Sequence, residues 1–315
     1  MGGLRALLAA ALAIAAASAA RGDAGLGPGD YRFRLDHDGL ERTYLVHVPT
    51  GYRPSQPTPL VVALHGGGGS AAHQAGESYG LIGQADREGT IVAFPNGFSR
   101  LPSGLLATWN AGLCCGQARD RQVDDVGFIK AMLEQLQTRL NVDRSRIFAT
   151  GMSNGGLMAY RLACELPGVF RAIAAVAGTD NTASCSPGQP VSVLHIHARD
   201  DDHVLYDGGA GPGAFRNRQA VTEFRSVPET IARWVKFDAC DPAPRTVLQN
   251  PGARCELYSG CAGGARVELC VTDRGGHSWP GGYKLRGGQP PSQALSANDL
   301  IWDFFLRPRA AGPQP

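Results

Sequence analysis

Ser153 lies at the centre of a Gly-x-Ser-x-Gly pentapeptide that spans residues 151–155. The surrounding stretch, Arg146–Tyr160, is typical of an apolar strand, a tight turn and a helix. A serine on such a turn has strained backbone angles, and a side chain two residues away would clash, which explains Gly151 and Gly155. The turn would place the hydroxyl at a helix N-terminus, where developing negative charge is favoured. These features predict a nucleophile, whereas the alternative, a glycine-rich loop with an exposed serine, explains neither flanking element.

A serine needs a base to remove its proton, and His277 fits this role best among the eight histidines. It follows the strand-like segment Val267–Thr272 and lies in the glycine-rich segment Arg274–Gly282. His203 also follows the candidate acids, but it shares their short loop, whereas the base is expected after a separate strand. The resulting order of serine, acid and histidine is that expected of a hydrolase on an α/β sheet.

The acid should follow the strand-like segment Val191–His197. Its carboxylate would hold the imidazole in one tautomer and stabilise the imidazolium. Three adjacent candidates occur there, and spacing alone does not choose among them: Asp200, Asp201 and Asp202.

Two backbone N–H groups are expected to stabilise the oxyanion. One belongs to Asn154, the residue after the nucleophile, and the other to the Gly66–Gly69 loop, which follows a buried-strand pattern at Leu60–Leu64. Glycines let the loop backbone approach a substrate closely. A phosphate-binding loop is the alternative, but the Gly-Lys-Ser/Thr ending that it requires is missing.

Three aromatic residues are candidates for lining a substrate cleft, although core or loop packing explains them equally well: Trp109, Tyr206 and Trp279. Asp124 and Asp125 lie at the predicted start of a helix. Helix capping and the helix dipole explain these carboxylates better than catalysis does.

The order of elements predicts an α/β fold. Strand-like and helix-like segments alternate after residue 60, which is typical of a mainly parallel sheet. Before it, Tyr31–Leu35 and Arg42–Val48 alternate as an antiparallel pair would. Neither a repeat nor a clear linker divides the chain. We therefore predict one catalytic domain at 30–306, between a flexible lead at 21–29 and a flexible tail at 307–315.

The remaining elements are predicted from apolar periodicity. A long loop at 95–122, rich in glycine and cysteine, separates two of them. Strands are expected at Leu60–Leu64, Gly89–Phe94, Ala172–Ala177 and Val191–Ile196, helices at Tyr79–Glu88, Val123–Leu140, Pro228–Phe237 and Leu300–Leu306, and a hairpin at 255–272.

Composition excludes several function classes. The net charge of +2 is too small to indicate a nucleic-acid partner, and no apolar run beyond residue 25 could span a membrane. The N-terminus predicts export, because Arg5 precedes the apolar run Leu7–Ala17 and small residues suited to cleavage near Ala19 or Ala20. We therefore expect a signal peptide at 1–20, with no lipid anchor because no lipobox cysteine follows.

Eight cysteines, an even number, suggest disulfides in an exported protein. The local pattern favours one pair, Cys255 with Cys270, which would face each other across a hairpin that turns at 262–264. No cysteine or histidine group has the ligand spacing of a metal site.

Several spaced motifs occur in an order that supports a family assignment. The chain resembles the extracellular polyhydroxybutyrate depolymerase and feruloyl esterase group of α/β-hydrolases, carbohydrate esterase family 1 and its relatives. The likeness covers roughly residues 30–306. The matching stretches are Leu64–Gly67, Trp109–Gly112, Cys114–Gly116, Asp124–Phe128, Gly151–Gly156, Ser226–Thr230 leading to Trp234 and Cys240, and Gly275–Gly281.

The resemblance implies an α/β-hydrolase fold, with a mostly parallel sheet and helices on both faces. It implies Ser153 as nucleophile, His277 as base, and the amides of Gly67 and Asn154 as the oxyanion hole. It also implies a disulfide between Cys240 and Cys261, which leaves Cys255 with Cys270. The other four cysteines would pair among themselves: Cys114, Cys115, Cys164 and Cys185.

The resemblance also points to one acid. The family has His-Gly-Thr-Ala-Asp, and His197–Asp201 matches this frame, with further residues in register at Val204, Tyr206, Gly208 and Gly209. Asp201 then takes the catalytic position. The sequence departs from the pattern at Ala198, Arg199, Asp200 and Leu205, which leaves Asp200 and Asp202 as alternatives.

Together these features predict a secreted serine esterase that needs no cofactor or metal. Its substrate would be a hydroxyalkanoate polyester, or a feruloyl or acetyl ester on plant polysaccharide. Polymer-active depolymerases often carry an extra binding domain, and none is expected after Leu306, which favours soluble oligoesters or feruloyl-type esters. The alternative from another class is a non-catalytic carbohydrate-binding or surface protein on a hydrolase scaffold.

Overall fold

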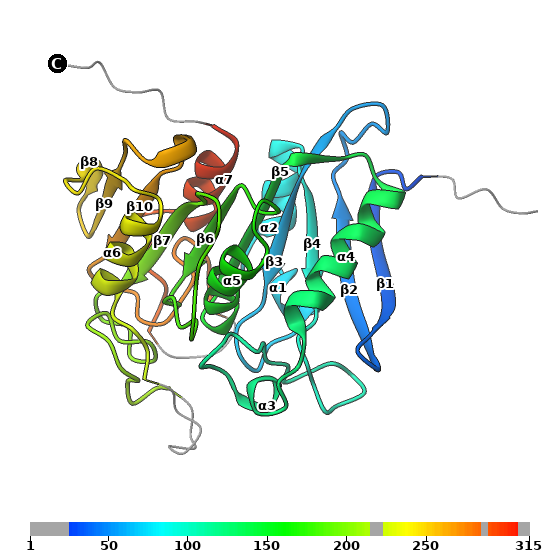
Figure 1. Cartoon of the computed structure of the whole chain (residues 1–315), viewed down its shortest axis with the longest axis horizontal. Helices are drawn as coiled ribbons and strands as arrows, with labels where there is room; N and C mark the ends of the chain where they lie inside the picture. Colours follow the sequence, from blue (N-terminus) through cyan, green and yellow to red (C-terminus); the bar gives the residue numbers. More distant parts are fainter. Residues whose placement is uncertain (1–24, 215–222, 285–288, 308–315) are drawn as a thin grey trace, which may run out of the picture.

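The computed structural model describes residues 25–214, 223–284 and 289–307. Figure 1 shows one sheet of ten strands in the order β1-β2-β4-β3-β5-β6-β7-β10-β9-β8. The predicted signal peptide at 1–20 lies outside the described residues, as does the predicted tail beyond Arg307. Among the described residues, no helix has both the length and the apolar character needed to cross a membrane.

The six central strands of the sheet, from β4 to β10 in this order, are parallel. Antiparallel strands complete both ends, β2 and β1 at one and β9 and β8 at the other. The predicted mostly parallel α/β sheet is therefore confirmed. The strands are β1 (Gly29–His37), β2 (Leu40–Val48), β3 (Thr58–Leu64), β4 (Ile91–Pro95), β5 (Val142–Met152), β6 (Ala172–Val176), β7 (Ser192–Ala198), β8 (Arg245–Asn250), β9 (Ala253–Tyr258) and β10 (Val267–Thr272).

Helices cover both faces of the sheet. One face packs against α4, α5 and α6, which lie in front of the sheet in Figure 1, and the other against α2 and α7. Strands β3, β4 and β6 are buried along their whole length, which explains their continuous apolar sequences. The helices are α1 (Ala71–Gln74), α2 (Leu81–Glu88), α3 (Gly116–Asp120), α4 (Asp125–Arg139), α5 (Asn154–Glu165), α6 (Val227–Phe237) and α7 (Ala297–Leu306), with a 3-10 turn, η2, at Ala262–Gly264.

Some elements differ from the prediction. Strand β8 was not predicted, because it pairs only with β9 and is mostly exposed, so its sequence lacks a strong apolar pattern. Helix α2 begins at Leu81 rather than Tyr79, because Gly80 before it has a left-handed backbone with φ of 65°. The predicted flexible lead is partly held in place, since the amide of Leu26 donates to the carbonyl of Arg139 and its side chain packs against the core.

The cysteines form four disulfides. Cys240 pairs with Cys261, as the family resemblance implied. Cys255 pairs with Cys270 across the antiparallel register of β9 and β10, as the hairpin predicted. The remaining four cysteines do pair among themselves, as Cys114 with Cys115 and Cys164 with Cys185.

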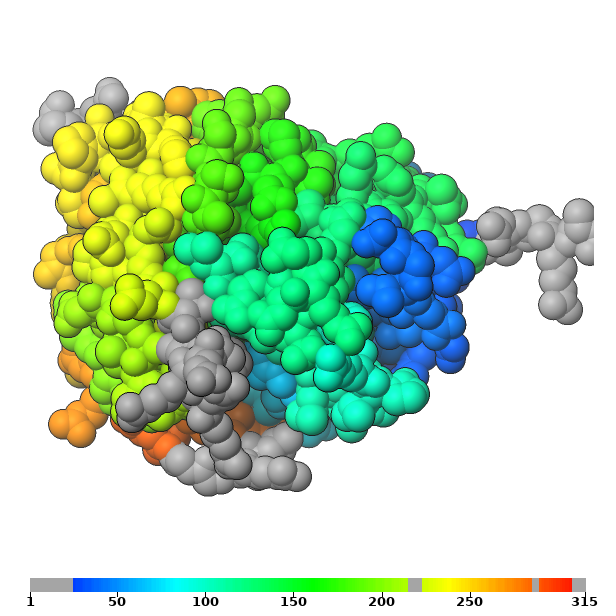
Figure 2. All heavy atoms as spheres, turned by 60° about the horizontal axis from the view of Figure 1, so that its bottom comes forward, coloured from blue at the N-terminus to red at the C-terminus, as the bar shows by residue number. Residues whose placement is uncertain are grey.

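The parallel strands bring the candidate site residues to one edge of the sheet. β3, β5, β7 and β10 all end at this edge, which is the lower side of Figure 1 and includes the segment around α3. Figure 2 brings this edge forward and shows the teal residues around α3 facing the yellow-green segment that follows β7. The loops after these strands therefore share one surface.

A buried carboxylate at the end of α6 has a predictable effect on stability. Asp238 accepts a hydrogen bond from the amide of Val191 (3.0 Å), but burial outweighs this bond and raises its pKa to about 7. Because the folded state binds this proton more tightly than the unfolded state, the stability from this group is present at low pH and is lost as pH rises toward about 7.

We expect Asp238→Asn to raise the thermal midpoint by several degrees at pH 8 and to change it by less than about 2 °C at pH 4. The amide oxygen of asparagine can still accept from Val191, so only the cost of the buried charge is removed. Scanning calorimetry at the two pH values measures the difference. Exposed Asp36→Asn is the control, and an equal shift at both pH values would contradict the assignment.

Candidate active site

Ser153 lies on a strained turn between β5 and α5. Its φ of 56° and ψ of −123° fall outside the regions that most residues adopt. A Cβ atom on Gly155 would overlap the carbonyl oxygen of Leu64 at the end of β3, and one on Gly151 would meet the backbone of Gly155. The motif glycines are therefore required by close packing of the turn against the neighbouring strand.

His277, on the loop after β10, is bonded to a single acid. Its Nδ1 lies 2.9 Å from Oδ2 and 3.1 Å from Oδ1 of Asp201, which follows β7. The Nε2 atom is then the ring nitrogen left to face the cavity, because Nδ1 is engaged by the carboxylate. Ser153 and His277 line the same cavity.

The Asp201 carboxylate is buried and held as an anion. Burial by itself would raise its pKa, but the hydrogen bond from His277 and the hydrogen bond from the amide of His203 lower the pKa below the ordinary aspartate value. Oδ1 also accepts from the amides of His203 (2.8 Å) and Val204 (3.0 Å).

The two neighbouring aspartates have different partners. Asp200 accepts a hydrogen bond from the amide of Gly276, one residue before His277. Asp202 bonds to Nδ1 of His203 at 2.7 Å. Of the three candidate acids, only Asp201 is bonded to His277, whereas Asp200 holds the loop that carries this histidine.

His203 packs flat on His277. Their ring centroids are 4.3 Å apart and the planes differ by 11°. His203 also lines the cavity, so the two Asp–His pairs lie one on the other beside Ser153. From sequence spacing His203 is only a weaker candidate for the base, because nothing in the spacing shows that the two loops stack.

The predicted oxyanion segments line the same cavity as Ser153. Gly66–Gly69 and Asn154 all line the cavity. The amides of Gly68 and Gly69 are bonded to the carbonyls of Ala107 and Gly66, which is consistent with Gly67 as the donor that faces a substrate. Asn154 is the first residue of α5, where backbone N–H groups have no partner within the helix.

Trp109 does not line the cavity, contrary to the prediction. Its side chain is fully buried, and its Nε1 donates to the carbonyl of His65 (2.9 Å). Its backbone amide donates to the side chain of Asn154 (2.8 Å), which donates in return to the Trp109 carbonyl (3.1 Å). Trp109 thus links the glycine loop to the start of α5, which explains why a large aromatic residue occurs there.

The other two aromatic candidates have different positions. Tyr206 is absent from the cavity lining and packs against His197 and the guanidinium of Arg199. Trp279 is nearly buried but lines an adjoining cavity of about 460 Å³, next to Tyr79 and Tyr283. Of the three aromatic candidates, only Trp279 lines either of these two cavities.

The cavity beside Ser153 has a volume of about 380 Å³. Several residues that line it were not predicted as site residues from the sequence, because they come from loops far apart in the chain. They are His73, Tyr79, Cys115, Met152, Leu157, Val204, Gly213, Ala214 and Phe224. His73, Tyr79 and Met152 also line the second cavity, so the two spaces share these side chains as a common wall.

The paired aspartates at the start of α4 act structurally. Asp124 caps the helix by accepting from the amide of Gly127 (2.9 Å), as predicted. Asp125 is buried, forms an ion pair with Arg42 (2.6 Å) and accepts from the amide of Asn110 (2.8 Å). This second carboxylate therefore holds the segment next to Trp109 rather than complementing the helix dipole alone.

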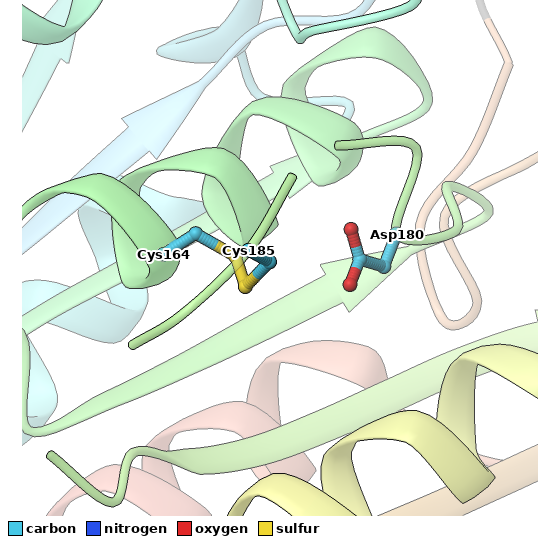
Figure 3. Close-up of side chains that lie close together, drawn as sticks. All are labelled: Cys164, Asp180 and Cys185. Carbon is cyan, nitrogen blue, oxygen red and sulfur yellow. A yellow bond between two sulfur atoms is a disulfide. The ribbon is translucent and has the colours of Figure 1, made fainter. Parts of the chain in front are cut away.

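Figure 3 shows Cys164, Cys185 and Asp180, a group that brings metal-ligand atom types together. The two sulfur atoms are bonded to each other, which removes both thiolates as ligands. The Asp180 carboxylate accepts hydrogen bonds from Thr182 and from the indole of Trp234. These contacts give the three residues a structural role.

The family model named Esterase matches residues 39–249, more than half of the chain. The chain belongs to the Esterase family. This membership identifies it as a carboxylic ester hydrolase. The α/β-hydrolase resemblance predicted from the motifs is thereby confirmed at the level of the group.

Curated relatives of this esterase include feruloyl esterases. Feruloyl esterase B of Piromyces equi is 31% identical over 75% of the chain, which spans 42% of that protein. Feruloyl esterase C of Emericella nidulans is 30% identical over 84% of each chain. The esterase therefore covers less than half of the first relative and most of the second.

Solved structures share the fold of this esterase. Acetyl xylan esterase from Aspergillus awamori aligns with a TM-score of 0.58 and 14% identity, covering 87% of this chain and 98% of that one. An S-formylglutathione hydrolase from Agrobacterium tumefaciens aligns with a TM-score of 0.51 and 16% identity, covering 79% and 88%. At these identities the likeness concerns the fold alone.

We expect Gly155→Ala to destabilise the esterase by at least about 3 kcal/mol, because the added methyl group overlaps the Leu64 carbonyl. Gly51→Ala is the matched control, since its Cβ atom meets no heavy atom within 4 Å; it should change stability by less than about 0.5 kcal/mol. Urea denaturation of both variants checks this, and equal midpoints would show that the turn tolerates a side chain.

Proposed function

We propose that this esterase hydrolyses its substrate through an acyl-enzyme formed on Ser153, with His277 as base and Asp201 as the acid that orients it. The observation that carries the proposal is the bond between Asp201 and His277 Nδ1, which leaves Nε2 for the cavity shared with Ser153. This is the arrangement that activates a serine hydroxyl. Residues 30–306 would act as one catalytic unit.

The reaction would proceed in two halves. Ser153 Oγ attacks the ester carbonyl carbon while its proton passes to His277 Nε2, and the amides of Gly67 and Asn154 stabilise the oxyanion. Collapse of this intermediate breaks the bond to the alcohol, which takes the proton from His277. Water then repeats the sequence and releases the acid. Each oxyanion donor would lower the barrier by about 3 kcal/mol.

The proposed substrate is a feruloyl-type or acetyl ester carried by a polysaccharide. The cavity beside Ser153 has aromatic and apolar residues in its walls, and it shares three of its lining residues with a second cavity next to Trp279 and Tyr283. An aromatic acyl group would pack favourably on such walls. The relatives named feruloyl esterases support the same class. Hydroxyalkanoate esters, including poly(3-hydroxybutyrate), form the second candidate on motif resemblance.

Secretion to an extracellular or periplasmic compartment belongs to the same proposal. Four disulfides suit an oxidising compartment, and the N-terminal segment has the charge and apolar pattern of a signal peptide. Neither a nucleic acid nor a membrane anchor is part of the proposed function.

Ser153→Ala should lower turnover on the order of 10⁶-fold, because no other group can form the acyl-enzyme. The measurement is hydrolysis of p-nitrophenyl acetate, methyl ferulate, acetylated xylan and a poly(3-hydroxybutyrate) clearing plate. Equal turnover by wild type and variant would favour the non-catalytic alternative. Wild-type activity on poly(3-hydroxybutyrate) but not on methyl ferulate would overturn the proposed substrate.

Asp201→Asn should lower kcat by about 10⁴-fold, since an amide favours the wrong tautomer of His277. Asp202→Asn is the matched control and should change kcat by less than about threefold, because its carboxylate contacts His203 instead. Asp200→Asn should have an intermediate effect through the amide of Gly276. If Asp202→Asn lowered kcat as much as Asp201→Asn, the assignment of the acid would be wrong.

A further inference from the structure

A fully buried chain of hydrogen bonds leads from the nucleophile helix to the acid loop. The hydroxyl of Tyr160, on α5, lies 2.8 Å from Nδ1 of His195. Nε2 of His195 lies 3.0 Å from Nδ1 of His197, and both residues point to the same face of β7. Nε2 of His197 lies 2.8 Å from the carbonyl oxygen of Val204 and 3.4 Å from Oδ2 of Asp201.

The members of this chain are uncharged. Burial lowers the pKa of His195 well below its ordinary value, and the adjacent His197 lowers it further. Burial also lowers the pKa of His197, although Asp201 and the Val204 carbonyl oppose the shift. Burial raises the pKa of the Tyr160 hydroxyl well above its usual range, and the nearby Asp180 carboxylate raises it further. Each imidazole therefore carries one proton.

Two acceptors determine where those protons lie. A carbonyl oxygen and a carboxylate converge on His197 Nε2, so a lone pair at this atom would be repelled by both. The proton of His197 must then be on Nε2, which makes Nδ1 an acceptor for His195 Nε2–H. His195 Nδ1 in turn accepts from Tyr160. All donors point in one direction, toward the acid loop.

The end of this chain holds the backbone that carries Asp201. The carbonyl of Val204 accepts from His197, while the amide of Val204 donates to Oδ1 of Asp201 (3.0 Å). His197 therefore contacts this tight loop at two points. It donates a hydrogen bond to the carbonyl of Val204, and it lies beside the carboxylate of Asp201. A tilt of this loop would shift Asp201 relative to His277.

We infer that His197, in its Nε2–H form, is a positioning residue that aligns Asp201 with His277, and that the buried pair of histidines maintains this tautomer. The inference rests on the proposed function, because Asp201 acts only through His277. A packing role alone is the alternative. It predicts that any loss of a hydrogen bond in the chain has the same effect.

The tautomers can be measured in the wild-type protein. Long-range ¹H–¹⁵N correlation spectra distinguish a protonated Nε2 from a protonated Nδ1. We expect both His195 and His197 to be Nε2–H at neutral pH. A protonated Nδ1 on His197 would overturn the inference, and this result would not depend on whether the protein hydrolyses any ester.

Three variants separate positioning from packing. His197→Leu keeps the bulk but removes the donor, and it should lower kcat by about tenfold or more with KM within about twofold. His197→Gln keeps a donor that can reach the Val204 carbonyl and should restore most of kcat. Tyr160→Phe is the matched control: it breaks the first bond of the chain, so it should lower the thermal midpoint while kcat stays within about threefold.

The downfield proton resonance of His277 Nδ1–H reports the bond to Asp201 directly. We expect it to persist in Tyr160→Phe and His197→Gln and to shift or broaden in His197→Leu. Two results would refute the inference and support a packing role alone. One is an equal loss of kcat in His197→Leu and Tyr160→Phe, and the other is an unchanged His277 Nδ1–H resonance in His197→Leu. An inactive wild-type protein would instead refute the proposed function. The tautomer and resonance measurements would still test whether His197 positions Asp201.

Discussion

The close approach of α5 to the end of β3 is the constraint on which the site depends. Gly155 lies so near the Leu64 carbonyl that no side chain fits between them, and Ser153 is forced to a φ of 56°. This contact places Ser153 next to the residues that follow β3, which are the glycines proposed to form part of the oxyanion hole. One packing contact therefore positions the end of β3, the Gly66–Gly69 loop and the start of α5 relative to one another.

A second set of contacts keeps this arrangement rigid. Asp125, buried against Arg42, binds the amide of Asn110, and the adjacent Trp109 bonds to both His65 and Asn154. Burial lowers the pKa of His65 to about 4, so its ring stays neutral; it donates to the Gly66 carbonyl and accepts from the amide of Gly97. Neutral, fully bonded polar groups can be buried without an uncompensated charge. The residue that precedes the glycine loop is thereby held by uncharged groups, the ring of His65 itself and the indole of Trp109.

Local features were predictable from the sequence, whereas contacts between loops were not. The turn at Ser153, the parallel strands and the Cys255–Cys270 pair follow from periodicity and glycine placement, because their causes lie within a few residues. Trp109 was assigned to the cleft because an aromatic residue in a long loop suits either role. Only its contacts with His65 and Asn154, two distant segments, decide that it is a buried support. The stacking of His203 on His277 could not be predicted either, because it also joins two segments that are far apart in the sequence.

The segment Arg199–Asp202 is where the sequence departs most from the family pattern, yet the structure gives each of its side chains a specific partner. The guanidinium of Arg199 packs over Tyr206, Asp200 bonds to the loop of His277, and Asp202 bonds to His203. The two carboxylates that flank Asp201 are thus occupied elsewhere, so neither competes with it for His277. Because Asp201 is also the member of this segment bonded to two backbone amides of its own loop, it is the carboxylate with the least freedom to move. Asp200 and Asp202 therefore hold the surroundings of Asp201 on the side of the loops. The neutral histidines of β7 contact the Asp201 loop on the side of the core.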